Sequence, residues 1–95
     1  LKISKEIKFK EGVCKSACNL GLVMYERGVY RKAEEFYKMA EEVCGSIENK
    51  EGVGLALSNL GLLFAERNDY KTAESLYNSA LKIAQDINNK RIESL

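Results

Sequence analysis

The sequence contains no histidine, no tryptophan and no proline. Without histidine, general-base chemistry would fall to a carboxylate or a lysine with a shifted pKa. A zinc site needs about four donors, and no histidine is available to complete a set with the three cysteines. No glycine-rich phosphate loop is present either, because Gly12, Gly21 and Gly28 are spaced as helix and turn positions. We therefore expect neither an enzyme nor a protein with a bound metal or cofactor.

Net charge and long hydrophobic runs are also lacking. Lys+Arg 15 against Asp+Glu 14 leaves a net charge of +1, which gives no attraction to nucleic acid or to an anionic membrane. No apolar run approaches the ~20 residues that span a bilayer, and nothing at the N-terminus reads as a signal peptide. We expect no nucleic-acid or membrane partner and a cytoplasmic location. Because the chain does not begin with Met, we also expect an excised or processed segment.

What the sequence does contain is one segment that occurs twice. The stretch NLGLVMYERGVYRKAEEFY, residues 19–37, is followed forty residues later by NLGLLFAERNDYKTAESLY, residues 59–77. Aligning residues 11–50 with residues 51–90 gives seventeen identities in forty positions without a gap. A fixed period between about 20 and 50 residues is the signature of a stacked repeat protein.

The same register extends to both ends of the chain. The opening LKISKEIKFK aligns with LKIAQDINNK at 81–90, and the closing RIESL aligns more weakly with EGVGL at 51–55. We therefore interpret residues 1–95 as a single domain cut from a longer array. Its parts are the tail of a preceding repeat at 1–10, repeat one at 11–50, repeat two at 51–90 and the start of a following repeat at 91–95.

Within each repeat the apolar residues recur at helical spacing. The pattern predicts helices near 11–27, 30–47, 51–67 and 70–87, with helical stubs at 1–7 and from 91. Gly28 and Asn68-Asp69 are suited to tight turns, because Gly and Asn tolerate a positive φ. Asn49 and Asn89 are predicted to cap the C-termini of the second and fourth helices.

Small residues recur in the middle of the predicted helices. Gly21 and Gly61 occupy the same position, where Gly costs up to about 1 kcal/mol relative to Ala. A plain four-helix bundle has no need to repeat them, so we expect close approach between paired helices. Gly21→Leu should then destabilise the fold, whereas Gly21→Ala should be far milder. Ala40 and Ala80 are expected to allow the same approach between one repeat and the next.

The cysteines also fall in positions for small residues. Cys14 aligns with Gly54, Cys18 with Ser58, and Cys44 with Ala84. An odd number of cysteines is most simply read as a reduced, cytosolic set. We interpret all three as compact packing residues, with a redox or metal role as the alternative.

Together these positions resemble the tetratricopeptide repeat. The residues that carry the resemblance are Ala17, Leu20, Gly21, Met24, Gly28, Tyr30, Ala33, Tyr37 and Ala40 in the first copy, and Leu57, Leu60, Gly61, Phe64, Asn68, Tyr70, Ala73, Tyr77 and Ala80 in the second. The resemblance covers essentially the whole chain. It implies an all-α fold, a right-handed superhelical stack of antiparallel helix hairpins.

Two departures narrow the resemblance. The common unit has about 34 residues and ends with a proline, whereas Gly45 and Gln85 stand at that place here and six further residues lengthen the second helix. This is similar to a forty-residue subclass found in Leu-Gly-Asn-type scaffolds, kinesin light chains and prokaryotic regulators. It argues against the chaperone-binding type that captures a C-terminal carboxylate, because that type needs a set of basic and Asn residues spread over three repeats.

The resemblance implies a protein–protein interaction module whose first helix in each repeat lines a concave groove. Helical spacing places on that face Lys15, Asn19, Leu22, Tyr25 and Glu26 in the first copy and Leu55, Asn59, Leu62 and Glu66 in the second, with Cys18, Ser58 and Ala65 beside them. An amide can both donate to and accept from an extended peptide. The alternatives are that the amides bond a neighbouring helix or water and have only a structural role, and that the apolar members are partly buried under the adjacent helix.

Six further residues, two arginines and four tyrosines, are assigned structural roles. Arg27 and Arg67 are expected to bond helix carbonyls or to pair with Glu26 and Glu66. Tyr30, Tyr70, Tyr37 and Tyr77 are expected to pack in the core or at the hinges.

The last expectation concerns the two ends of the array. A repeat buries its apolar faces only against its neighbours, so the faces around Ile3 and Ile7 and around Tyr77, Ile83 and Ile87 should be partly uncovered. Self-association through these faces is then possible. The second function considered is therefore a structural or regulatory spacer, or a self-association segment, of a larger protein.

Overall fold

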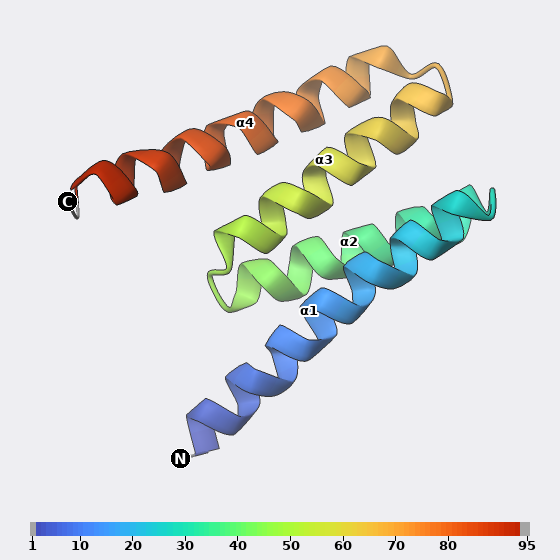
Figure 1. Ribbon diagram of the computed structural model, residues 1–95. Helices are drawn as coiled ribbons and strands as arrows, with labels where there is room; N and C mark the ends of the chain where they lie inside the picture. Colours follow the sequence, from blue (N-terminus) through green and yellow to red (C-terminus); the bar gives the residue numbers. More distant parts are fainter. Residues whose placement is uncertain (1, 94–95) are drawn as a thin grey trace.

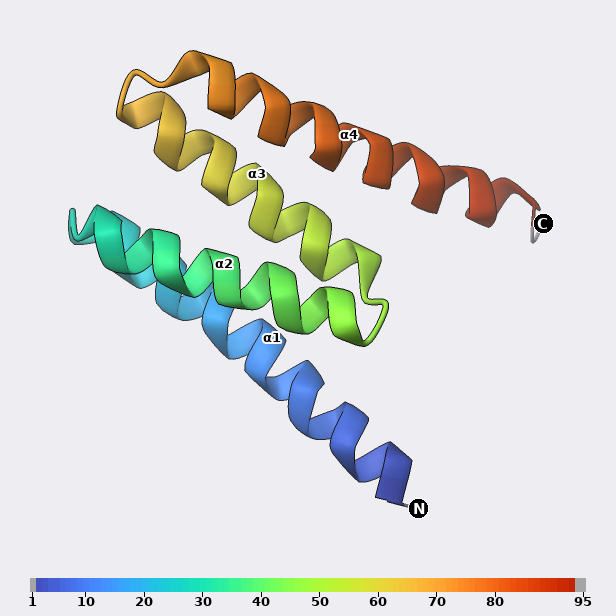
Figure 2. The ribbon, with the colours of Figure 1, turned by 180° about the vertical axis from the view of Figure 1, so that it is seen from behind.

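The computed structural model describes residues 2–93, and the side chains of residues 5–90. The chain forms four helices, α1 (Lys2–Glu26), α2 (Tyr30–Ser46), α3 (Lys50–Glu66) and α4 (Tyr70–Glu93), and no strand within residues 2–93. They form two antiparallel hairpins stacked side by side in the order α1, α2, α3, α4 (Figure 1). Seen from behind, α2 crosses in front of α1 (Figure 2). The predicted all-α stack of hairpins is confirmed.

Three turns of one kind connect the helices. In the first, the Val29 N–H donates to the Met24 carbonyl at 2.8 Å and Gly28 N–H donates to the Tyr25 carbonyl at 3.0 Å, with Gly28 at φ 80°. This pair of bonds is the Schellman motif, which needs a residue of positive φ after the helix. Asn68 (φ 66°) fills that place in the third turn, so the predicted turn residues are confirmed.

The middle turn differs from its prediction by one residue. Glu48, at φ 56°, is the left-handed residue that ends α2. Asn49 is instead the N-cap of α3, where its side-chain Oδ1 accepts from the Gly52 N–H at 3.1 Å. Asn89 lies inside α4 and caps nothing. The prediction of Asn49 and Asn89 as C-terminal caps is therefore wrong, because the amide side chain satisfies a helix start better than a helix end.

The outer helices are longer than predicted. A turn was expected between the stub at 1–7 and the helix from 11, and another near 87–90, but α1 runs unbroken from Lys2 and α4 continues to Glu93. Each further residue adds a backbone hydrogen bond to an existing helix. Glu48 ends α2 at the point where α3 folds back on it. Within residues 2–93 no further helix folds back in this way on the start of α1 or the end of α4. The start of a following repeat was expected at 91–95; residues 91–93 belong to α4, and residues 94–95 lie outside the described residues.

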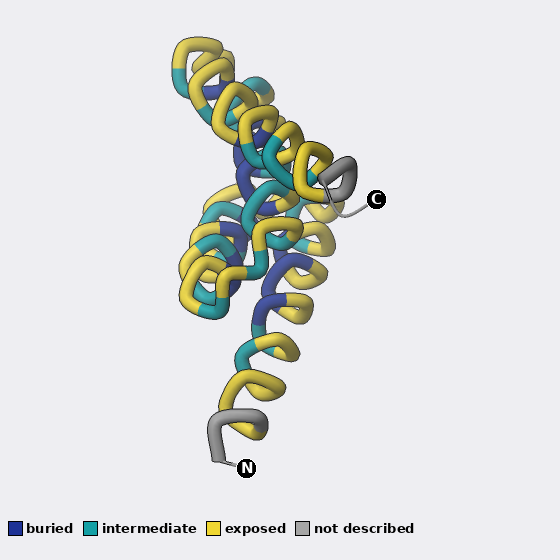
Figure 3. Tube along the Cα trace, turned by 90° about the vertical axis from the view of Figure 1, so that its left-hand side faces the viewer, coloured by how far each residue is buried: buried dark blue, intermediate teal, exposed yellow. Residues whose placement is uncertain are grey.

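α2 lies between α1 and α3 and packs against both. Its inner face carries Ala33, Tyr37, Ala40 and Cys44, all at most 1% exposed. Figure 3 shows the buried residues of the stack as dark blue segments on the inner sides of the helices. Small residues on α2 therefore let both neighbours approach closely, as the repeated positions predicted.

Gly21 allows α1 to rest directly on Tyr37. A Cβ at Gly21 would lie 2.6 Å from Tyr37 Cε1, and one at Gly61 would lie 2.9 Å from Tyr77 Cε1. The two sites differ in the freedom of the ring, because Tyr37 is 1% exposed and Tyr77 is 41% exposed. The expectation that Gly21→Ala is mild therefore needs correction, since even one methyl group collides with a buried ring.

We predict that Gly21→Ala lowers the free energy of unfolding by about 1–3 kcal/mol, the range for overpacking a core, and that Gly21→Leu lowers it further. Gly61→Ala is the matched control, because Tyr77 can move outward and the better helix propensity of Ala offsets the strain. Urea unfolding followed by circular dichroism measures both. Equal stabilities for the two alanine variants would contradict this account of the repeated glycine.

The seam between α2 and α3 also contains a charge cluster. Glu34 Oε1 accepts from Arg67 Nη1 at 2.6 Å, and Glu34 Oε2 lies 2.8 Å from Lys38 Nζ. Arg67 was expected to bond helix carbonyls or to pair with Glu66, but it pairs with Glu34 on the neighbouring helix. The hydrogen bonds from Lys38 and Arg67 hold the pKa of Glu34 below its usual value.

This cluster predicts a specific acid sensitivity. Because the pKa of Glu34 is lowered by folding, its contribution to stability is complete above the ordinary glutamate pKa of about 4.3. That contribution is lost as the pH falls through the lower folded-state pKa. Glu34→Gln should cost about 1 kcal/mol or less at neutral pH and nothing once Glu34 is protonated. Unfolding curves at several pH values measure the difference in the free energy of unfolding between Glu34→Gln and the wild type. Glu74→Gln, at the equivalent position on α4, is the control. A loss of stability in Glu34→Gln that persists in acid would contradict this prediction.

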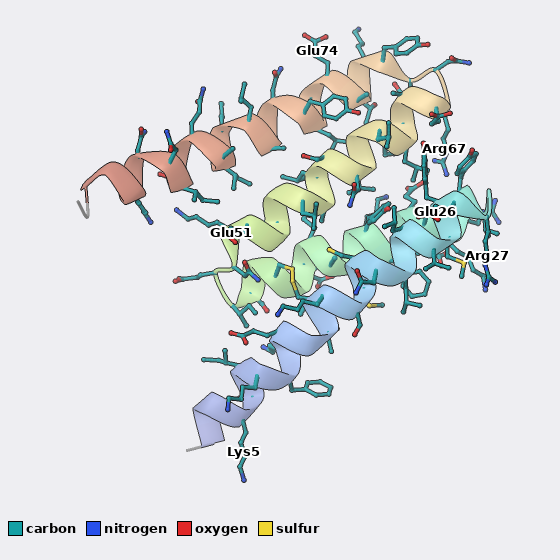
Figure 4. All side chains as sticks on the ribbon, viewed as in Figure 1. Lys5, Glu26, Arg27, Glu51, Arg67 and Glu74 are labelled. Carbon is teal, nitrogen blue, oxygen red and sulfur yellow. A yellow bond between two sulfur atoms is a disulfide. The ribbon has the colours of Figure 1, made fainter. Side chains whose placement is uncertain are left out.

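The cysteines depart from the prediction most clearly. Cys14 on α1 and Cys44 on α2 form a disulfide, with their Cα atoms 5.3 Å apart (Figure 4). All three cysteines are buried, as packing residues should be, but only Cys18 is a free thiol. Burial raises the pKa of Cys18, so it is less reactive than an exposed thiol. The expectation of a fully reduced set is wrong, because the antiparallel hairpin brings Cys14 of α1 against Cys44 of α2.

Candidate partner-binding groove

The predicted groove residues form two parallel rows, one on α1 and one on α3. Leu22, Leu55 and Leu62 are 45%, 54% and 42% exposed, although leucine is usually buried. Lys15, Asn19, Glu26 and Glu66 are exposed as well, whereas Tyr25 and Asn59 are half-buried. Each row therefore combines an apolar side chain with an amide and a charge, on the same face of the first helix of each hairpin.

The two asparagines make no hydrogen bond to any other residue within the part of the chain described. The alternative that each amide bonds a neighbouring helix is therefore not realised in this structure. Asn has a low helix propensity, so its presence in a helix interior suggests that its side chain makes a specific interaction. Both amides keep their donor and acceptor groups available to a bound segment.

A single hydrogen bond connects the two rows at one end. The Tyr25 hydroxyl on α1 donates to Glu66 Oε1 on α3 at 3.1 Å. Burial and this carboxylate raise the pKa of Tyr25, so the phenol keeps its proton and remains a donor. The Tyr25 ring also contacts Tyr30 of α2, with centroids 5.6 Å apart. The sequence placed Tyr25 and Glu66 on one surface but gave no signal that they bond to each other.

The other tyrosines divide between core and surface. Tyr37 is buried as predicted, and Tyr30 is 37% exposed beside Tyr25. Tyr70, at 64% exposed, donates from its hydroxyl to Asn68 Oδ1 at 3.0 Å and is not a core residue. The difference arises because α2 is covered on both sides, whereas α4 has a neighbour on one side only.

One large hollow lies away from the predicted rows. It has a volume of about 1120 Å³ and is lined by the start of α3 and the end of α4, including Val53, Ile83, Ile87, Lys50 and Asp86. Lys50 and Asp86 form an ion pair there, and each charge shifts the pKa of the other, Lys50 upward and Asp86 downward. Of the predicted groove residues, Leu55 lines a smaller hollow of about 420 Å³ beside it.

None of the described helices is both long and apolar enough to cross a membrane. In the same part of the chain, no three His, Cys, Asp or Glu side chains gather in a way that could hold a metal ion.

The comparisons with known proteins agree with the architecture. The family model described as tetratricopeptide repeat matches residues 10–86, which include both hairpins apart from their outermost turns. Neither the curated proteins nor the solved structures returned a match.

Proposed function

We infer that this chain, because it belongs to the tetratricopeptide repeat family, acts through contacts with other proteins. Repeats of this family are in general protein–protein interaction modules. We propose more specifically that the rows on α1 and α3 bind one segment of a partner, an extended peptide or a helix. We also propose that the repeats divide at 11–50 and 51–90.

The main support for this proposal is the row of exposed leucines beside two asparagine side chains that make no hydrogen bond within the described residues. A partner segment laid across α1 and α3 would bury Leu22, Leu55 and Leu62, and apolar burial is the main source of binding energy. Asn19 and Asn59 would pair with its backbone. The flanking charges carry both signs, Lys15 on one side and Glu26 and Glu66 on the other, so a partner of mixed charge fits better than a strongly acidic or basic one.

The test is a selection from a random peptide library displayed on phage, followed by calorimetry with the selected peptides. Leu22→Ser and Leu62→Ser should weaken binding of a selected peptide at least tenfold, with Asn19→Ala and Asn59→Ala weakening it less. Leu20→Ser on α1 is the matched control, since Leu20 and Leu22 are 43% and 45% exposed on different faces of one helix. Peptides whose binding responds to Leu20 and not to Leu22 would contradict the groove.

A structural or regulatory role within a larger protein is the second candidate. The uncovered ends of the stack favour it, because Ile7 and Tyr77 are each 41% exposed as expected for the terminal faces; the side chain of Ile3 lies outside the described residues. We also propose that the chain has no catalytic role. The cytoplasmic location stays a prediction, and the Cys14–Cys44 disulfide weighs against it, because cytosolic thiols are kept reduced.

A further inference from the structure

The seam between α2 and α3 shows how one hairpin of this chain receives the next. On the α3 side, Ala56, Leu60 and Leu63 are at most 2% exposed, and Gly52 rests on the disulfide, with a Cβ there only 2.6 Å from Cys44 Sγ. On the α2 side the matching residues are Ala33, Tyr37, Ala40 and Cys44. The Arg67–Glu34 ion pair lies at one end of this seam.

The face of α1 is a second copy of the α3 side, and no helix within the described part of the chain covers it. Leu20 is 43% exposed where Leu60 is 2% exposed, and Val23 is 41% exposed where Leu63 is fully buried. Gly12, the equivalent of Gly52, would have no atom within 4 Å of an added Cβ. Beside it, α1 and α2 enclose a hollow of about 420 Å³ whose lining is mainly apolar and includes Phe9, Val13, Leu20, Phe36 and Met39.

The outer face of α4 is likewise a second copy of the α2 side. Tyr77 is 41% exposed where Tyr37 is 1% exposed, although the two rings rest on equivalent glycines. Ala84, the equivalent of the fully buried Cys44, is exposed. Leu81 adds an apolar side chain, 56% exposed, where α2 has Glu41. The chain therefore ends in two faces that match the two sides of its own internal seam.

The charges repeat in the same way. Arg27 occupies the position of Arg67 and Glu74 the position of Glu34, and both are exposed and take part in no ion pair or hydrogen bond within the described residues. Figure 4 shows Glu74 pointing outward from α4 on the side away from α3, and Arg27 at the opposite edge of the stack. One end thus offers the cation and the other the anion that the internal seam brings together.

We propose that a second copy of this chain docks head to tail, with the outer face of α4 in one copy packed on the α1 face of the next. Glu74 of one copy pairs with Arg27 of the other, as Glu34 pairs with Arg67. Tyr77 covers Leu20 and Val23, as Tyr37 packs with Leu60 and Leu63. The contact is heterologous, so it continues the stack and adds copies until the ends are blocked. This surface is separate from the proposed groove and does not depend on it.

Sedimentation over a concentration series is the first test. The wild-type chain should gain mass with concentration, and Leu20→Asp should weaken the association at least tenfold. Leu22→Asp is the matched control, because Leu22 is equally exposed on the groove face. A chain that stays monomeric at every concentration overturns the proposal, as does equal weakening by both variants. Loss of peptide binding in Leu22→Asp with association intact would separate this surface from the groove.

A charge exchange tests the register without touching the apolar residues. Arg27→Glu alone places two carboxylates at the contact, and Glu74→Arg alone places two guanidinium groups there, so each single variant should associate several-fold more weakly than the wild type. An equimolar mixture should regain association, because each contact between unlike copies again joins opposite charges. The proposal is overturned if the mixture associates no more strongly than either variant alone. It is also overturned if an unrelated protein binds these faces while copies of the chain do not associate with each other.

Discussion

Reduction of the Cys14–Cys44 disulfide is expected to lower the free energy of unfolding by about 3–4 kcal/mol. The bond closes a chain segment with a sequence separation of 30, and a loop of that size loses about this much conformational entropy in the unfolded state. Because small domains have a total stability of about 5–15 kcal/mol, the reduced chain should unfold at a far lower urea concentration. Urea unfolding with and without a reducing agent measures the difference.

Cys18 provides the internal control. Cys18→Ala leaves the bond in place and removes only one buried sulfur, so its oxidised and reduced forms should differ as much as those of the wild type. Cys44→Ala should abolish the difference, with Ala84 showing that alanine fits the equivalent place. Identical unfolding curves for the oxidised and reduced wild type would show that the bond does not cross-link the hairpin in solution.

Tyr37→Ala is expected to be the most damaging single truncation of a side chain. Tyr37 is 1% exposed and lies between Gly21 of α1 and Leu60 and Leu63 of α3. Removing a buried aromatic ring costs about 3–5 kcal/mol, because the cavity only partly collapses. The Tyr37 ring packs both within the first hairpin and against α3, so its removal weakens both contacts. The midpoint of thermal unfolding should therefore move to a much lower temperature.

Tyr77→Ala is its counterpart on the uncovered helix. Tyr77 rests on Gly61 in the same way but is 41% exposed, so at low protein concentration its truncation should cost roughly half as much, in proportion to the buried area. At high concentration Tyr77→Ala should also weaken the proposed head-to-tail contact. Equal costs for the two variants in the dilute monomer would contradict the role assigned to α3 in covering Tyr37.

The turns at Gly28 and Asn68 could be predicted because their cause is local. A positive φ after a helix selects Gly or Asn, and this choice is visible in the sequence. Glu48 occupies the same conformation without being either, so only the packing of α3 against α2 accounts for it. Local chemistry therefore located two of the three turns, and tertiary packing decided the third and the extents of α1 and α4.

Contacts between helices were harder to predict than the helices themselves. Cys14 and Cys44 lie at equal distances along the chain from Val29, and in an antiparallel hairpin such residues come together; this signal was present but not used. The pairing of Arg67 with Glu34 depends on how two hairpins stack, which the repeat register alone does not specify. For the groove, the sequence predicted which residues share a face, and the structure adds the bond between Tyr25 and Glu66.

The order in which the helices touch has a consequence for the speed of folding. Within the described residues, α1 packs with α2, α2 with α3, α3 with α4, and α1 lightly with α3, but α4 contacts neither α1 nor α2. Nearly every contact between helices therefore joins helices that follow one another in the sequence. The contact order of this fold is therefore low. Helical proteins of low contact order fold in about microseconds to milliseconds. We expect this chain to fold on that timescale, with either hairpin able to form first and to serve as a template for the other.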